Sequence, residues 1–267
     1  MTTDTSPYSV ECRIDSDGIA SLIINRPDRA NAFNAETINA LIAEIEKLTQ
    51  SSGIRGLRLE GVGKNFSAGA DAEWMRSMAS KSIEENQQDA MQLANLLDKL
   101  DNFPQPTMAI VQGAAFGGAL GLVCCCDMVV AHTDAKFCLS EVKLGLVPAT
   151  IAPYVIRAMG VRNARRYMLT AELIDAEVAM KLQIVHQVLE KNDIEQYVKG
   201  WFKSILSFGP QALIETKKLC LECDGKEIDT SMRQYTSELI AKIRASEEGQ
   251  EGLSAFLEKR LPNWSSN

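Results

Sequence analysis

The residues of this chain with the clearest chemical potential lie in a glycine-rich turn. Gly113, Gly117, Gly118 and Gly121 fall within nine residues, directly after an apolar run at 108–112 that is typical of a short buried strand. A second apolar run, typical of a buried helix, begins inside the turn. Because glycine has no side chain, backbone N–H groups stay uncovered at the positive end of this helix. The turn therefore predicts a site for an anion or a developing oxyanion.

A second turn of similar character lies upstream, where residues 66–71 read Phe-Ser-Ala-Gly-Ala-Asp. One glycine cluster alone has a simpler interpretation, because glycines also allow a helix and a strand to pack closely. Two such turns, however, could converge on one atom. Together they favour a site where backbone N–H groups from both turns contact the same ligand atom.

One carboxylate stands out downstream. Phe137, Leu139 and Glu141 share one parity of a predicted strand, so Glu141 would follow two apolar residues onto a buried face. Burial would raise the pKa of this carboxyl toward the range useful for proton transfer. Alternatively, the strand ends at Leu139, and Glu141 caps the next turn or pairs with Lys143.

Motifs of other enzyme classes are missing from the sequence. Residues 61–65 resemble a phosphate-binding loop, but Arg58 stands where its first glycine is needed, and Asn65 replaces the Ser or Thr after the lysine. The sequence contains no G-x-G-x-x-G, G-x-S-x-G or H-E-x-x-H pattern. Nucleotide-binding, serine-nucleophile and zinc-hydrolase chemistries therefore lack their usual residues.

The seven cysteines and two histidines form no metal-binding pattern. Cys124, Cys125 and Cys126 are consecutive in an apolar segment, and adjacent residues of a helix point in different directions. His132 and His186 are not spaced from these cysteines as the ligands of a metal site would be. We expect no metal, and we expect these cysteines to be small core residues of a reduced, cytoplasmic protein.

Composition excludes several classes of partner. The 267 residues are 46% apolar and 24% charged, as in an ordinary globular protein. A net charge of −7 argues against a nucleic-acid-binding face, although one or two lysines would suffice for a phosphate-bearing ligand. The first residues show no signal peptide, and no apolar run reaches the length of a transmembrane helix. We expect neither a nucleic-acid nor a membrane partner.

Strands alternate with helices in the first two thirds of the chain, and helices dominate the last third. This order predicts an α/β fold with a helical C-terminal region. A hairpin is expected at 8–15 and 19–25, helices at 34–50 and 82–100, and strands at 54–60, 108–112, 128–131 and 136–139. The final helices are expected at 228–245 and 247–259.

Several segments in order resemble the enoyl-CoA hydratase/isomerase family, the crotonases: residues 65–71, 113–127, 140–148, 167–176 and 255–260. The segments near Gly117 and Glu141 are most similar to the bacterial methylglutaconyl-CoA and carboxygeranoyl-CoA hydratase branch. The resemblance implies a crotonase-like spiral of ββα units. Residues 1–200 would form the acyl-CoA-binding core, and residues 201–267 a helical region that forms a homotrimer or a dimer of trimers. The substrate would be an acyl-CoA thioester. No cofactor is implied, because coenzyme A is part of that substrate.

The resemblance also assigns roles to individual residues. Ala70 and Gly118 match the two residues whose N–H groups bind the thioester oxygen, and Glu141 matches the general acid/base. Phe256 and Lys259 match C-terminal positions that help to hold the CoA nucleotide, although an ordinary amphipathic helix would also place them there. The remaining substrate-binding positions are Ala68, Asp71, Gly117, Gly121 and Pro148.

The chain departs from the hydratase pattern at Gly121, where the first of two glutamates is expected. Two carboxylates suit hydration because they orient a water between them. One carboxylate can still move a proton between carbons, as in the family's isomerases. After the catalytic glutamate the family usually has Pro-Gly-x-Gly, but residues 148–151 here read Pro-Ala-Thr-Ile. Glu73 stands where the family often has a lysine near the CoA phosphates. We predict hydration of a branched or carboxylated 2-enoyl-CoA; the alternatives are double-bond isomerisation and non-catalytic acyl-CoA binding.

Overall fold

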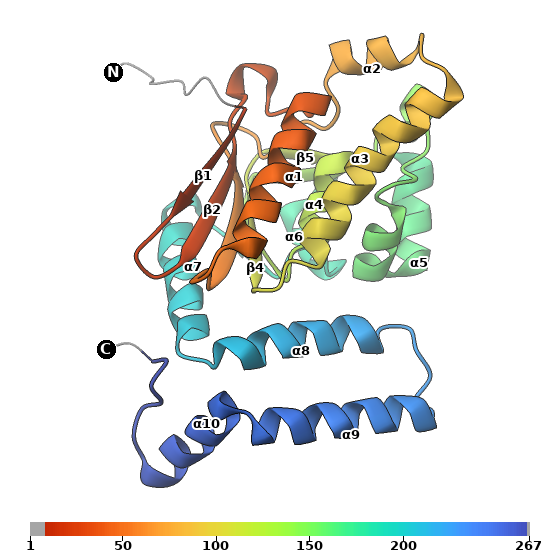
Figure 1. The fold of residues 1–267 in the computed structure, drawn as a ribbon. Coiled ribbons are helices and arrows are strands. Elements are labelled where there is room, and N and C mark those ends of the chain that lie inside the picture. Colours follow the sequence, from red (N-terminus) through yellow and green to blue (C-terminus); the bar gives the residue numbers. More distant parts are fainter. Residues whose placement is uncertain (1–8, 266–267) are drawn as a thin grey trace. The chain divides into compact units, whose positions relative to one another are not determined.

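The computed structural model describes residues 9–265, which divide into two compact units (Figure 1). The first unit contains the described residues up to Phe103 and those from Thr107 to Glu195, and the second contains 104–106 and the residues from Gln196 onward. Tyr8, in the predicted first strand, lies outside the described residues. The predicted boundary after residue 200 and the roles of the two regions stay predictions.

A six-stranded sheet forms the centre of the first unit. The first two strands pair antiparallel, and all other neighbouring strands of this sheet run parallel. The antiparallel pair confirms the predicted hairpin. The carboxylate of Asp15 fixes the hairpin turn by accepting hydrogen bonds from the N–H groups of Asp17 and Ile19, both at 2.9 Å. In order across the sheet, the strands are β1 (Val10–Ile14), β2 (Ile19–Ile24), β3 (Gly56–Gly61), β4 (Thr107–Val111), β6 (Met128–His132) and β9 (Gln187–Leu189).

A second sheet of three short strands adjoins the glycine turn. β5 (Ala114–Phe116) pairs parallel with β7 (Lys136–Cys138), which pairs antiparallel with β8 (Ile174–Asp175). The sequence predicted a direct passage from strand to helix at the glycine turn, yet β5 lies within it. Three residues between two glycines are too few to show a period-two pattern.

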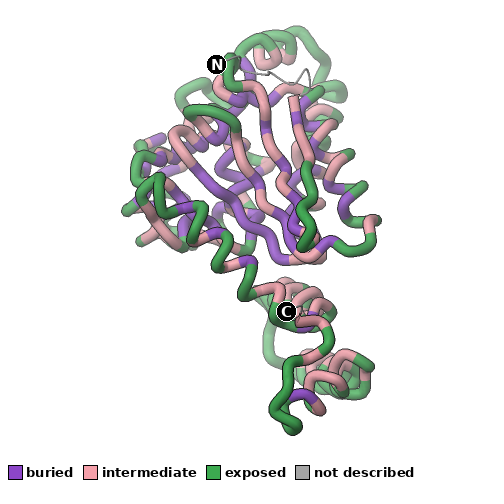
Figure 2. The backbone as a smooth tube through the Cα atoms, turned by 90° about the vertical axis from the view of Figure 1, so that its left-hand side faces the viewer, coloured by how far each residue is buried: buried purple, intermediate pink, exposed green. Residues whose placement is uncertain are grey.

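Six helices of the first unit pack beside these sheets. In Figure 1, α1 and α3 lie side by side, and α1 also contacts β1 and β2. α1 presents Leu41, Ile45 and Leu48 to the core, each about 1% exposed, as its amphipathic pattern predicted. The buried residues follow the strands of this unit, drawn purple in Figure 2. The helices are α1 (Ala35–Gln50), α2 (Ala72–Met78), α3 (Ile83–Asp101), α4 (Gly118–Cys124), α5 (Ala152–Thr170) and α6 (Ala176–Lys181).

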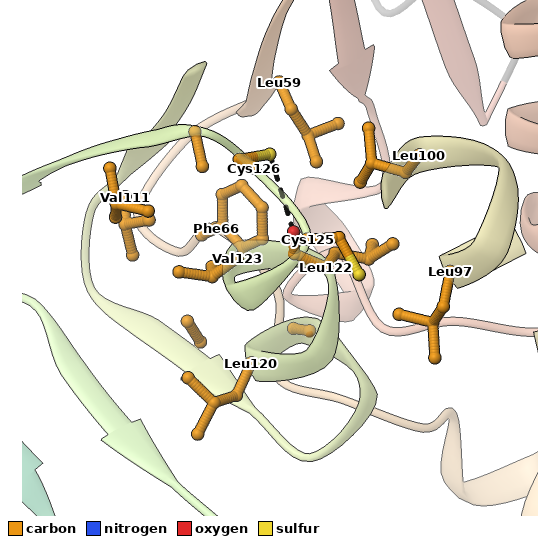
Figure 3. Packing of buried hydrophobic residues seen from close by; sticks show 14 of the residues in the cluster. Leu59, Phe66, Leu97, Leu100, Val111, Leu120, Leu122, Val123, Cys125 and Cys126 are labelled. Carbon is orange, nitrogen blue, oxygen red and sulfur yellow. Dashed lines mark hydrogen bonds between the residues drawn. The ribbon is translucent and has the colours of Figure 1, made fainter. Parts of the chain in front are cut away.

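The apolar run after the glycine turn forms α4, at the centre of the core (Figure 3). The helix ends at Cys124. Cys125 and Cys126 are buried among leucines and valines, and the Cys126 thiol contacts the carbonyl oxygen of Leu122 at 3.5 Å. All seven cysteines are free. Cys125 and Cys126 are therefore small core residues, as predicted. The prediction is wrong for Cys220 and Cys223, which are exposed.

Helices make up the second unit, which confirms the predicted helical C-terminal region. α7 (Lys191–Leu206) leads into α8 (Pro210–Cys223), α9 (Thr230–Ala245) and α10 (Glu247–Glu258). α10 contacts both α8 and α9, but no residue of α8 or α9 is buried. Among residues 9–265, no helix combines the length and the apolar character needed to cross a membrane.

Candidate active site

A cavity of about 720 Å³ opens in the first unit beside the glycine turn. Its walls come from the 68–70 turn, α2, the first half of α3, the start of α4 and the segment at 140–151. Most of the lining is apolar, which suits an acyl chain. The lining residues with polar side chains, apart from the Trp74 indole, are Asn86, Asp89, Ser140, Glu141 and Thr150.

The two glycine-containing turns lie side by side at this cavity. Ser67 and Ala115 form a parallel bridge, and the N–H of Phe116 donates to the carbonyl oxygen of Ser67 at 3.1 Å. Gly69 has φ +93°, and a Cβ there would lie 2.9 Å from the carbonyl oxygen of Phe116. The close approach of the two turns therefore requires glycine at position 69.

At the cavity, two backbone N–H groups of these turns have no acceptor within residues 9–265, so they are available to a ligand. They belong to Ala70 and Gly118, and both residues line the cavity. By contrast, the N–H of Gly117 donates to Cys138 and that of Asp71 to Phe33. Gly118 is also the first residue of α4, where the helix dipole adds positive potential. This pair of free donors is suited to an oxyanion.

Glu141 reaches the cavity from a short 3-10 helix, Glu141–Leu144, and not from a strand. β7 ends at Cys138, so the predicted continuation of the strand to Glu141 is wrong. The alternative was that Glu141 caps the turn or pairs with Lys143. Within the described residues the structure shows neither interaction.

The Glu141 carboxylate lies against the glycine turn. A Cβ on Gly117 would lie 3.2 Å from Oε1, which is closer than an ordinary van der Waals contact, so the carboxylate lies close to this glycine. Oε2 is buried and has no hydrogen-bond partner among the described residues. Burial raises the pKa of Glu141. A half-buried carboxyl group with one unpartnered oxygen, close to two free N–H donors, can exchange protons with a bound molecule.

Comparison with known proteins identifies the family. Residues 15–267 match the family model described as "Enoyl-CoA hydratase/isomerase". This chain belongs to that family. A solved enoyl-CoA hydratase structure from Shewanella pealeana is 48% identical, with a TM-score of 0.94 over 98% of this chain and 97% of that chain. Its similarity confirms the crotonase fold.

Two curated relatives carry more specific names. The crotonyl-CoA hydratase of Syntrophomonas wolfei is 30% identical over 248 residues, which span 92% of this chain and 94% of that protein. The 2,3-dehydroadipyl-CoA hydratase of Escherichia coli is 30% identical over 244 residues, which span 91% and 93% of the two chains. Both are hydratases, and their named acyl groups differ.

Gly121 marks where this crotonase differs from the two-glutamate pattern of hydratases. The residue is buried in α4 and does not line the cavity. A Cβ there would lie 2.4 Å from Cγ2 of Ile151 and 3.2 Å from a methyl group of Leu97. Ile151 instead reaches the cavity wall together with Pro148. The space that a first glutamate would need is thus filled by an apolar side chain.

Asp71 supports the site without lining the cavity. Its carboxylate accepts hydrogen bonds from the N–H groups of Glu73 and Trp74 at the start of α2, and it forms an ion pair with Arg26 at 3.1 Å. Burial alone would raise the pKa of Asp71, but these hydrogen bonds and the Arg26 charge lower it overall. The predicted contact of Asp71 with substrate stays a prediction.

The other predicted residues fall into two groups. Ala68 and Gly117 line the cavity, as Pro148 does. Phe256 and Lys259 belong to the second unit: Phe256 is 81% exposed on α10, and Lys259 ends that helix with φ +56°. Their contact with CoA stays a prediction.

Two cavity residues were missed by the sequence analysis. The indole N–H of Trp74 on α2 donates to Oδ1 of Asp89 on α3 at 3.3 Å, and both residues line the cavity. The amphipathic pattern that predicted α3 also places Asp89 four residues before Leu93, on the same helix face. That signal was available, but the sequence alone does not show what this face contacts.

Proposed function

We propose that this crotonase hydrates a 2-enoyl-CoA through a thioester enolate. The observation that carries the proposal is one cavity bordered by the free N–H groups of Ala70 and Gly118 and by the Glu141 carboxylate, whose Oε2 has no partner among the described residues. A non-catalytic acyl-CoA carrier would have no need for a half-buried carboxylate with an unpartnered oxygen at this place, because such a group costs stability. The hydratase names of relatives support the same reaction.

Each group has one role in the proposed reaction. The thioester oxygen accepts hydrogen bonds from Ala70 and Gly118, which stabilise the enolate by about 3 kcal/mol per donor. Water oxygen bonds to C3, and the C2=C3 π electrons move through C1 onto the thioester oxygen. Glu141 removes a proton from this water and returns one to C2, so the enzyme ends unchanged.

For the acyl group, the lining favours the branched chain over the carboxylated one. Apolar side chains of α2, α3 and the 144–151 segment form most of the wall, and the described lining contains no Lys, Arg or His. A carboxylated chain of the methylglutaconyl type would bring a negative charge near Glu141 and Asp89. Such a chain would need a cation from outside this lining, for example from a neighbouring subunit.

Double-bond isomerisation is the second candidate function. The observation that favours it is the closed position at Gly121, which leaves Glu141 as the one glutamate on the cavity wall within the described residues. A single carboxyl group can take a proton from C2 of a 3-enoyl-CoA and return it to C4.

Three assays separate these functions. Loss of 2-enoyl thioester absorbance in water, tested with unbranched, 3-methyl-branched and carboxylated chains, would support hydration and rank the acyl groups. Conversion of a 3-enoyl-CoA to a 2-enoyl-CoA, with solvent deuterium in the product, would instead support isomerisation. Binding of all these compounds without turnover would contradict both enzymatic proposals.

We further propose that the enzyme is a cytoplasmic homotrimer or dimer of trimers and needs no cofactor beyond its CoA substrate. The second unit supports the assembly, because apolar side chains such as Phe256 and Leu257 are 81% and 77% exposed there. Light scattering on the purified protein measures the assembly. Turnover after treatment with a chelator tests for a metal requirement, and a monomer or loss of activity would contradict the respective proposal.

A further inference from the structure

Hydration needs a group that orients the attacking water, and the proposed function gives Glu141 a different task. The position that would supply a first glutamate is closed, because Ile151 fills the space beside Gly121. Among the described lining residues, the other carboxylate is Asp89. The question is whether Asp89 is placed to contact the reacting atoms.

Asp89 lies on the cavity face of α3, one helical turn before Leu93. Leu93 lies one helical turn farther along, and its Cδ2 would be 3.6 Å from a Cβ on Gly118. Residues four apart share one face of a helix, and side chains lean toward its N-terminus. The face of α3 that carries Asp89 and Leu93 therefore borders the cavity beside the proposed oxyanion site, and both residues line that cavity.

A hydrogen bond orients the Asp89 carboxylate. The Trp74 indole donates to Oδ1 at 3.3 Å, and Oδ2 has no protein partner among residues 9–265. Trp74 is itself held in the first turn of α2, where its N–H donates to the buried, Arg26-paired Asp71. One oxygen of Asp89 is thus fixed, and the other remains available to accept a hydrogen bond within the cavity.

We propose that Asp89 is the second carboxylate of this hydratase, so that α3 and not α4 supplies it. This inference rests on the proposed function. Oδ2 of Asp89 accepts a hydrogen bond from one O–H of the attacking water, while Glu141 removes the proton of the other O–H. The O–C3 bond forms as the π electrons move to the thioester oxygen, Glu141 returns a proton to C2, and Asp89 stays ionised throughout.

The test compares hydration with a partial reaction that needs no water attack. Exchange of the C2 protons of a saturated acyl-CoA with D2O requires the oxyanion donors and Glu141, but no oriented water. Asp89→Asn keeps an oxygen that can accept from Trp74 and removes the negative charge. We expect it to lower kcat for hydration by at least about 100-fold and to leave C2-proton exchange unchanged.

Two further variants make the result specific. Glu84→Gln neutralises an exposed carboxylate on the same helix and should leave both rates unchanged. Trp74→Phe removes the hydrogen bond that orients Asp89, and it should lower hydration less than Asp89→Asn does. Trp74→Phe should lower hydration more than it lowers C2-proton exchange, because only hydration needs the oriented Asp89.

Several outcomes would overturn the proposal. Wild-type hydration by Asp89→Asn would remove Asp89 from the reaction, and an equal loss of hydration and exchange would show a structural role. A raised KM for one acyl chain with unchanged kcat would show that Asp89 selects the chain instead. A wild-type enzyme that exchanges C2 protons but hydrates nothing would overturn the proposed function, and this inference with it.

Discussion

The Glu141 carboxyl group lies where its charge is poorly compensated by the protein. Oε2 is buried without a partner among the described residues, and Oε1 lies against the backbone of Gly117. The residue nevertheless lines the cavity, where its carboxyl group can meet a bound molecule. A poorly compensated carboxylate lowers the stability of the fold, and such destabilising groups are common at functional sites.

The pH dependence of catalysis tests this description of Glu141. Because burial raises its pKa, a larger fraction of the carboxyl group is protonated in weak acid than for an exposed glutamate. A general base must be ionised, so kcat/KM should fall as the pH decreases through this raised pKa. A pH–rate profile should place the acid limb above the ordinary glutamate pKa of about 4.3; a limb at or below that value would contradict the prediction.

Gly121 offers a test of packing. A Cβ there would be 2.4 Å from Cγ2 of Ile151, so we expect Gly121→Ala to lower the free energy of unfolding by about 1–3 kcal/mol. Adding Ile151→Ala should make the double variant less destabilised than the sum of the single changes. Gly200→Ala is the control, because no atom lies within 4 Å of a Cβ there and alanine favours helix α7. Denaturant unfolding measures all four variants, and an unchanged stability of Gly121→Ala would contradict the prediction.

At the scale of elements, α2 depends on its first residues. Asp71 caps the helix and pairs with Arg26, and α2 carries Trp74 to the cavity. We expect Asp71→Ala to lower the free energy of unfolding by at least about 1 kcal/mol and to raise KM. Asp71→Asn retains a capping oxygen, so its effect should be smaller; equal effects would show that the cap is unimportant.

The same residue predicts a pH effect on stability. The pKa of Asp71 is lowered in the folded protein, so its stabilising effect is present above the ordinary aspartate pKa. This contribution is lost as the pH falls through the folded-state pKa. The stability difference between wild type and Asp71→Ala should therefore shrink in strong acid.

Elements with a long periodic pattern were predictable, whereas three of the short strands were not, although the three-residue β7 was. α1 and α3 cover 16 and 19 residues with clear apolar faces, and the β1–β2 hairpin has a local turn signal. β5, β8 and β9 have three residues or fewer and exist because of pairing partners distant in sequence. The glycine turns are short too, but they were predictable because glycine residues themselves mark a local backbone conformation and need no distant partner. Asp89 was missed because its significance depends on a tertiary contact with Trp74.

At the scale of the whole molecule, the seven cysteines differ in their exposure to solvent. Cys220 and Cys223 on α8 are exposed, whereas Cys125, Cys126 and Cys138 are buried and Cys12 and Cys124 are partly covered. Burial raises the pKa of the Cys124, Cys125 and Cys138 thiols, and the thiolate is the reactive form. We expect a thiol reagent to modify two cysteines of the native protein quickly and the others only on unfolding. Loss of the fast phase in the Cys220→Ser, Cys223→Ser double variant is the control, and a fast phase that persists there would contradict the assignment.

In the proposed mechanism, the N–H groups of Ala70 and Gly118 stabilise an enolate, and Glu141 moves the protons. The most direct measurement is hydration of the best 2-enoyl-CoA by wild type and Glu141→Gln, with acyl-CoA binding measured in parallel. We predict that the wild type consumes the 2-enoyl thioester, and that Glu141→Gln lowers kcat by about 10²–10⁴-fold with binding nearly unchanged. Hydration by Glu141→Gln at the wild-type rate would contradict the account.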